Sequence, residues 1–187
     1  MDHYFDIRLR PDPEFPAYQL MDALFAKLHR VLAEQQRTDI GISFPQVQTR
    51  PPKLGEVLRL HGGDAALEAL SEGPWMGGMR QMVEIAAIAA APIVAAHRRV
   101  IRVQAKSSPE RLRRRLMRRK QISAEEACVQ IPDTAAERVN LPFVEIASRS
   151  TGQRFRLFLH HGPIQTQPVS GTFNSYGLSQ IATIPWF

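Results

Sequence analysis

The chain has 187 residues, of which 44% are hydrophobic and 22% charged, enough to bury a core in one large domain or two small ones. Its 24 Lys and Arg outnumber its 18 Asp and Glu, which gives a formal net charge of +6. It has no long apolar run, no signal-peptide layout at the N-terminus and a single cysteine, Cys128. These features argue against a transmembrane protein, a secreted protein and a disulfide or cysteine-rich zinc framework, so we expect a cytoplasmic protein.

The first half of the chain predicts alternating strands and helices. Residues 3–9 alternate as in a strand, and the leucines between 16 and 36 recur every four residues, as on the buried face of a helix. The order β-α-β-β-α-β predicts an α+β fold with a ferredoxin-like (RRM-like) domain over 1–94. The remaining elements are strands at 39–44 and 54–61, a short helix capped by Asp64 and ended by Gly73, and a strand over about 79–88.

The second half, 95–187, predicts an α+β domain that contains an arginine-rich helix. Residues 89–97 read as a linker, and Ser107 or Ser108 is expected to cap a helix over about 108–120. A second helix, over 124–138, begins with a capping box formed by Ser123 and Glu126. The predicted strands lie at 98–106, 141–150, 153–162 and 171–179.

The positive charge is concentrated in the first of these helices. Arg111–Lys120 carries seven positive charges, and without them the chain has 17 basic residues (24 − 7) against 18 acidic ones. Five arginines fall within an arc of roughly 140° on the helix, and Leu112 and Leu116 form a narrow strip beside them. Like charges on one face repel unless a polyanion neutralises them, so the pattern favours a nucleic-acid site over a solvated basic face. The five are Arg111, Arg114, Arg115, Arg118 and Arg119.

The residues alone leave the kind of nucleic acid open. The helices at 109–120 and 124–138 could form a DNA-binding helix-turn-helix, although in that motif the second helix reads the bases and here the first is basic. The A-form major groove of RNA is too narrow for side chains except near the end of a short hairpin. Phe155 could stack on a terminal base pair, but its alternation with Leu157 and Leu159 favours a core position.

The histidines give weaker evidence for a catalytic or metal-binding role. His29 lies at the edge of a predicted helix, four residues after Phe25, where a histidine is usually structural. His160 and His161 are adjacent on a strand and point to opposite faces, so they cannot easily share a metal ion. His61 is expected at a surface position near a strand end.

Four long segments resemble one known family. They are “HYFDIRLRPDPEFP”, “RVQAKSSPERLRRRLMRR”, “PFVEIASRSTGQRFRLFLHHGP” and “YGLS…PWF”. They are similar to the Csy-type endoribonucleases that process CRISPR repeats in type I-F systems, and the resemblance runs from Met1 to Phe187 with the same segment order. It implies an antiviral-defence enzyme that binds the repeat stem-loop of precursor CRISPR RNA and cuts just 3′ of the hairpin. It also implies that the protein stays on the mature crRNA and joins other subunits of a type I-F surveillance complex, and we expect the free protein to be monomeric.

The resemblance assigns roles to individual residues. His29 would be the catalytic histidine, Ser148 the catalytic serine, and Tyr176 the residue that orients the histidine. In the implied reaction, neutral His29 deprotonates the ribose 2′-OH and Ser148 aligns it. The products are a 2′,3′-cyclic phosphate and a 5′-OH, and neither a metal nor a cofactor is required. The expected RNA-binding residues are Arg102, Gln104, Arg111, Arg114, Arg115, Arg118, Arg119, Lys120, Ser150, Thr151 and Phe155.

Two other classes of function stay open. The arginine-rich helix alone would suffice for a non-catalytic subunit that binds an RNA hairpin. Less favoured is a helix-turn-helix DNA-binding regulator built on 109–138.

Overall fold

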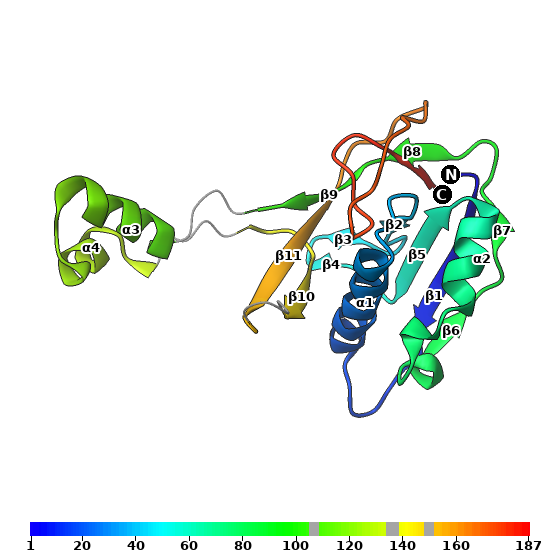
Figure 1. The fold of residues 1–187 in the computed structure, drawn as a ribbon, viewed down its shortest axis with the longest axis horizontal. Helices are drawn as coiled ribbons and strands as arrows, with labels where there is room; N and C mark the ends of the chain where they lie inside the picture. Colours follow the sequence, from blue (N-terminus) through cyan, green and yellow to red (C-terminus); the bar gives the residue numbers. More distant parts are fainter. Residues whose placement is uncertain (105–108, 134–138, 148–151) are drawn as a thin grey trace. The chain divides into compact units, whose positions relative to one another are not determined.

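The computed structural model describes residues 1–104, 109–133, 139–147 and 152–187, and the chain forms two compact units (Figure 1). The first unit contains Met1–Arg102 and Leu141–Phe187, and the second contains Val103–Asn140. The boundary expected near residue 94 falls inside the first unit, where the C-terminal segment packs with the N-terminal part of the chain. None of the helices in the described ranges combines the length and apolar character needed to cross a membrane.

An antiparallel sheet forms the centre of the first unit. Its strands lie in the order β2 (Gly41–Ser43), β5 (Val57–Gly62), β1 (His3–Leu9) and β6 (Val83–Ile85), and β7 (Ala89–Ala90) pairs with the start of β1. Phe5, Ile7 and Leu9 alternate along β1 and are all buried, which is the period-two pattern of a strand with one face in the core. The fold is therefore mixed α and β with an antiparallel sheet, as the sequence predicted.

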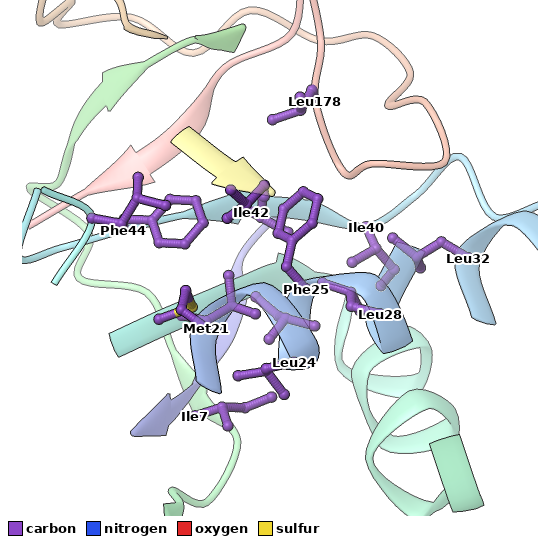
Figure 2. Close-up of a cluster of buried hydrophobic side chains, with 14 of the residues drawn as sticks. Ile7, Met21, Leu24, Phe25, Leu28, Leu32, Ile40, Ile42, Phe44 and Leu178 are labelled. Carbon is purple, nitrogen blue, oxygen red and sulfur yellow. The ribbon is translucent and has the colours of Figure 1, made fainter. Parts of the chain in front are cut away.

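Two helices lie in front of this sheet in Figure 1, α1 (Ala17–Glu34) and α2 (Asp64–Glu72). Two short 3-10 turns follow α2, η1 (Pro74–Met76) and η2 (Arg80–Met82). The four-residue leucine spacing of α1 is confirmed as its buried face, because Leu20, Leu24, Leu28 and Leu32 are at most 5% exposed. Figure 2 shows the last three of these leucines in one cluster with Ile42 and Phe44.

Two polar residues of β5, Arg59 and His61, alternate with the buried Leu58 and Leu60. Arg59 donates two hydrogen bonds to Asp6, at 2.7 and 2.9 Å, and its guanidinium lies 4.5 Å from the ring centroid of Tyr4 and 4.2 Å from that of Phe187. The C-terminal strand β12 (Ile184–Trp186) pairs antiparallel with β8 (Ala96–Arg98). These contacts join the end of the chain to the central sheet.

A second sheet of the first unit consists of β10 (Phe143–Ala147), β11 (Arg154–His161) and β9 (Val100–Val103). Buried side chains of β10 and β11 extend the core of the central sheet. Asp22 of α1 accepts a hydrogen bond from the backbone N–H of Glu145 at 2.9 Å, and burial raises the pKa of the Asp22 carboxyl. A small hairpin of β3 (Gln48–Thr49) and β4 (Pro52–Lys53) completes the described strands.

The second unit is built from two helices, α3 (Pro109–Lys120) and α4 (Ala124–Gln130). The capping box predicted at the start of α4 is confirmed. The Ser123 hydroxyl accepts from the N–H of Glu126 at 3.1 Å, and the Glu126 carboxylate accepts from the N–H of Ser123 at 2.9 Å. Gln121 adopts a φ of 52°, the left-handed conformation that often ends a helix.

One predicted strand is wrong. Residues 171–179 form a turn-containing segment outside the strands, because the Asn174 side chain accepts hydrogen bonds from the backbone N–H groups of Tyr176 and Leu178. Asparagine commonly closes turns in this way, and the donors it satisfies are then withheld from a ladder.

Other boundaries differ by smaller amounts. Helix α4, expected to reach 138, ends at Gln130, and 134–138 lie outside the described residues, as do the candidate caps Ser107 and Ser108. The N-cap of α2 is Gly63, with Asp64 as the first helical residue. The segment expected as a linker at 89–97 contains β7 and the start of β8, and the strand expected over 79–88 is reduced to β6 after the turn η2.

Candidate functional site

His29 lies on α1 with its imidazole half-buried, and its Nδ1 is 2.8 Å from the backbone carbonyl oxygen of Ser175. A carbonyl oxygen can only accept, so Nδ1 carries the proton in this hydrogen bond. In the neutral ring, Nε2 is then the nitrogen with the free lone pair. The fold therefore presents His29 in the tautomer whose Nε2 can accept a proton.

The ring of Tyr176 lies against the imidazole of His29. The two rings are stacked, with centroids 3.9 Å apart and planes 11° apart. The buried ring of Phe25 is nearly parallel to the ring of Tyr176, with centroids 6.4 Å apart. Phe25 is in turn stacked with Phe44 at the same centroid distance. The aromatic rings thus connect His29 to the core, so that the imidazole has a defined orientation.

A glycine places this tyrosine. Gly177 has a φ of 69°, and a Cβ at this position would lie 2.6 Å from Cγ2 of Ile42. Its carbonyl oxygen accepts a hydrogen bond from the N–H of Ile42 at 3.0 Å. Only a residue without a side chain fits both the left-handed backbone and this close approach to β2.

Arg102 and Phe155 lie in the same cluster. The guanidinium of Arg102 is 5.5 Å from the ring centroid of Phe155 and 6.0 Å from that of Tyr176. Phe155 is half-buried and packs at the margin of the core, so the core position favoured by its strand spacing is partly borne out. The structure brings His29, Tyr176, Arg102 and Phe155 together from α1, the C-terminal segment, β9 and β11.

Three predicted site residues are not among those that the structure describes. Ser148, Ser150 and Thr151 lie outside the described residues, in the connection between β10 and β11. Gln104, exposed after β9, belongs to the second unit.

The charged face of α3 has the form that the sequence predicted. Leu116 is buried and Leu112 half-buried, which gives the helix its attachment. The basic residues of the predicted face are exposed: Arg111, Arg114, Arg115, Arg118, Arg119 and Lys120. A row of solvated cations on one side of a helix is suited to bind a polyanion.

Arg113 differs from the other basic residues of α3. Its side chain is 17% exposed, and it donates to the carbonyl oxygen of Ile131 and to the carboxylate of Asp133, each at 2.7 Å. It therefore holds α3 against the segment that follows α4. The helical phase already separated Arg113 from the other five arginines, but sequence reasoning gave it no partner.

The expected surface position of His61 is wrong. Its side chain is fully buried on β5 and lies 2.8 Å from the Ser43 hydroxyl, and burial lowers its pKa to about 3. His161 is also buried, with a pKa lowered to about 3 by the same cause, whereas its neighbour His160 is exposed. This confirms that the two adjacent histidines face opposite sides of the strand.

Among the described residues, no group of three or more His, Cys, Asp or Glu side chains is arranged to hold a metal ion. The cluster around His29 therefore consists of an imidazole, two aromatic rings and a guanidinium. An imidazole of fixed tautomer can transfer a proton, and the guanidinium and rings can contact an anion or a base.

The fold and site define a mixed α and β protein that combines a half-buried histidine–tyrosine stack with a separate arginine-bearing helix. The family model described as CRISPR-associated protein (Cas_Csy4) matches residues 4–187. Two relatives, both named CRISPR-associated endonuclease Cas6/Csy4, align over all 187 residues and over the whole of each relative. The relative from Pseudomonas aeruginosa (strain UCBPP-PA14) is 53% identical, and that from Escherichia coli (strain UTI89 / UPEC) is 46% identical. The chain belongs to the Csy4 family of CRISPR-associated proteins.

Proposed function

We propose that the chain is the endoribonuclease that processes precursor CRISPR RNA by cutting just 3′ of the repeat hairpin. The observation that carries the proposal is the hydrogen bond from His29 Nδ1 to the Ser175 carbonyl, because it leaves Nε2 as a proton acceptor. Family membership and the names of the full-length relatives support endonuclease activity on the CRISPR pathway.

The chemistry proposed for His29 uses the nucleophile that RNA carries. Nε2 of His29 removes the proton of the ribose 2′-OH, and the resulting oxyanion attacks the adjacent phosphorus as the bond to the 5′ oxygen breaks. The leaving 5′ oxygen takes up a proton from water. Ser148 would hold the hydroxyl in line for this attack. The products are a 2′,3′-cyclic phosphate and a 5′-OH, and the reaction needs no metal ion. The stack on Tyr176 supports the role of that residue in orienting the base.

Binding of the hairpin is assigned to a different set of residues. The exposed arginines and Lys120 of α3 would contact phosphates in the groove, and Arg102 and Gln104 would read bases at the foot of the stem. Phe155 would stack on the terminal base pair, and its half-exposed ring under Arg102 is compatible with this. Ser150 and Thr151 would lie near the scissile phosphate.

The fold of the first unit supports a ferredoxin-like N-terminal domain. The support comes from the strand order β2-β5-β1-β6, which is antiparallel throughout, and from the helices that follow the first and third of these strands in the chain. We propose that 1–94 forms this domain and that 95–187 supplies the RNA-binding elements.

The assembly and location follow from the same proposal. The hairpin contacts survive cleavage, so we expect the protein to remain on the mature crRNA and to join other subunits of a type I-F surveillance complex. The free protein would be a cytoplasmic monomer.

The test uses a labelled repeat hairpin and a copy with one 2′-deoxy sugar at the cleavage site, both in EDTA. Cleavage of the first and binding without cleavage of the second is expected. Cleavage of the deoxy copy would exclude attack by the 2′-OH, and a requirement for magnesium would exclude the metal-free reaction. Tight binding without cleavage of either would instead indicate a non-catalytic hairpin-binding subunit, and preference for duplex DNA a DNA-binding regulator.

A further inference from the structure

The peptide group between Ser175 and Tyr176 is hydrogen-bonded at both ends. Its N–H, on Tyr176, donates to Oδ1 of Asn174 at 2.9 Å. Its C=O, on Ser175, accepts from Nδ1 of His29 at 2.8 Å. Asn174 and His29 are thus joined through a single peptide plane.

The geometry of the peptide makes these two bonds dependent on each other. In a trans peptide the N–H and C=O point in opposite directions, and the group is planar. When Asn174 holds the N–H on one side, the C=O must point to the other side, where the imidazole lies. An acceptor on the N–H also polarises the group, which makes the carbonyl oxygen a stronger acceptor.

Further contacts fix the loop that carries this peptide. The Asn174 side chain also accepts from the N–H of Leu178 at 3.2 Å, and the backbone groups of the same two residues pair at 2.9 Å. On one side of the turn Phe173 donates to the carbonyl of Thr38, and on the other Gly177 accepts from Ile42. The ends of the loop are therefore anchored, and Asn174 determines how the peptide between them is turned.

We propose that Asn174 is a positioning residue that sets the tautomer of His29 through the Ser175–Tyr176 peptide. Its carboxamide orients the carbonyl, the carbonyl takes the Nδ1 proton, and Nε2 is left free to accept a proton. Without the carboxamide, the peptide can rotate, Nδ1 loses its acceptor, and the imidazole can carry its proton on Nε2. This inference rests on the proposed role of His29 as the base, but the tautomer itself can be measured without RNA.

The test is the ¹⁵N NMR spectrum of the full chain with ring-labelled histidines. The chain has six histidines, and the signals of His29 are those lost in His29→Ala. Wild type is expected to show the neutral His29 ring with the proton on Nδ1. Asn174→Ala should show a substantial fraction with the proton on Nε2. Asn174→Asp, which keeps an oxygen acceptor in the same place, should retain the wild-type tautomer.

Single-turnover cleavage of the repeat hairpin provides the second measurement. For Asn174→Ala we expect a loss of roughly tenfold to a hundredfold in rate with unchanged hairpin affinity, and rescue by Asn174→Asp. If the alanine variant proves unstable, Asn174→Gly removes the acceptor while suiting a turn backbone, and the same two readouts apply.

An unchanged His29 tautomer in the variants that lack the acceptor overturns the inference, whatever happens to the rate. If the tautomer changes but the cleavage rate does not, the proposal that Asn174 positions His29 for cleavage is also overturned. A different result would show that the proposed function fails: the His29→Ala variant would cut the hairpin. In that case the NMR spectra would remain a valid test of whether Asn174 sets the tautomer of His29.

Discussion

The His29 cluster and the charged face of α3 are built in opposite ways. In the His29 cluster, four side chains from distant segments, His29 included, meet in a half-buried site. The imidazole is held there by a ring stack and a hydrogen bond. On α3, the basic residues other than Arg113 are exposed, and they all come from one helix of twelve residues. The cluster depends on tertiary packing, whereas the face of α3 depends on helix formation and two leucine contacts.

This difference suits the two roles proposed above, proton transfer for His29 and RNA binding for the face of α3. A proton acceptor must have one tautomer and one orientation, which requires neighbours that restrain it. A phosphate-binding surface needs positive charge and side chains long enough to reach the ligand. We therefore expect changes in the His29 cluster to alter cleavage, and changes on the face of α3 to alter affinity.

The largest effect is expected for His29→Ala. Loss of a positioned general base should lower the single-turnover cleavage rate by roughly a hundredfold to ten-thousandfold, while hairpin affinity stays within about twofold. Rate and affinity are measured separately, by quenched cleavage and by filter binding of the 2′-deoxy hairpin. His160→Ala, which removes an exposed histidine of the same unit, is the matched control and should behave as wild type. If His29→Ala lowered hairpin affinity as much as it lowered the cleavage rate, the His29 cluster would serve binding as well as cleavage.

Acid should lower the free energy of unfolding of the first unit but not that of the second. The pKa values of His61 and His161 are lowered to about 3 by burial, so the folded first unit keeps both neutral, while the unfolded chain protonates them below about pH 6.5. Proton binding to the unfolded state then removes stability as the pH falls from about 6.5 toward 3. Between pH 7 and pH 5 the loss is on the order of 2 kcal/mol for each histidine. The stretch 103–140 contains no histidine and should not respond in this range.

Urea unfolding at pH 7, 6 and 5 checks this prediction. Trp75 and Trp186, the two tryptophans of the chain, both belong to the first unit, so their fluorescence follows that unit alone. The fluorescence midpoint should fall steeply with pH. A midpoint that is constant from pH 7 to pH 5 would contradict the buried, neutral state of the two histidines.

An intermediate effect is expected for Arg115→Ala on the exposed face of α3. Loss of one charged phosphate contact, worth about 1.5 kcal/mol, should weaken hairpin binding roughly tenfold and lower the salt slope by about one. The rate of cleavage from the saturated complex should not change. Arg113→Ala is the matched control on the same helix: it breaks the bonds to Ile131 and Asp133 and should destabilise the second unit by about 1 kcal/mol. An equal fall in salt slope for both variants would mean that the two arginines are not distinguished by their partners.

Local patterns predicted much of this fold. The leucine spacing gave the buried face of α1, Ser123 and Glu126 gave the start of α4, and the helical phase separated Arg113 from the exposed arginines. In each case the deciding interactions lie within one or two helical turns, so the sequence contains both partners at a known spacing.

Features that depend on distant contacts were missed. The burial of His61 depends on β5 being central and on the Ser43 hydroxyl, 18 positions earlier in the chain. The expected strand at 171–179 was overruled by the acceptor on Asn174, a turn signal that the alternation of residues concealed. The meeting of His29 with Ser175 spans 146 positions, and residue spacing cannot predict such a contact; it was the family resemblance that pointed to His29 and Tyr176.

The smallest effect is expected at Tyr176, where the ring rather than the hydroxyl makes the described contact with His29. Tyr176→Phe keeps a ring of the same shape stacked on the imidazole, so its cleavage rate should stay close to that of wild type. Tyr176→Ala removes a stack worth about 0.5–1.5 kcal/mol and should slow cleavage by roughly twofold to tenfold, with hairpin affinity less affected. Single-turnover rates of the two variants decide the point. If the phenylalanine variant loses as much activity as the alanine variant, the hydroxyl has a role in cleavage that stacking does not explain.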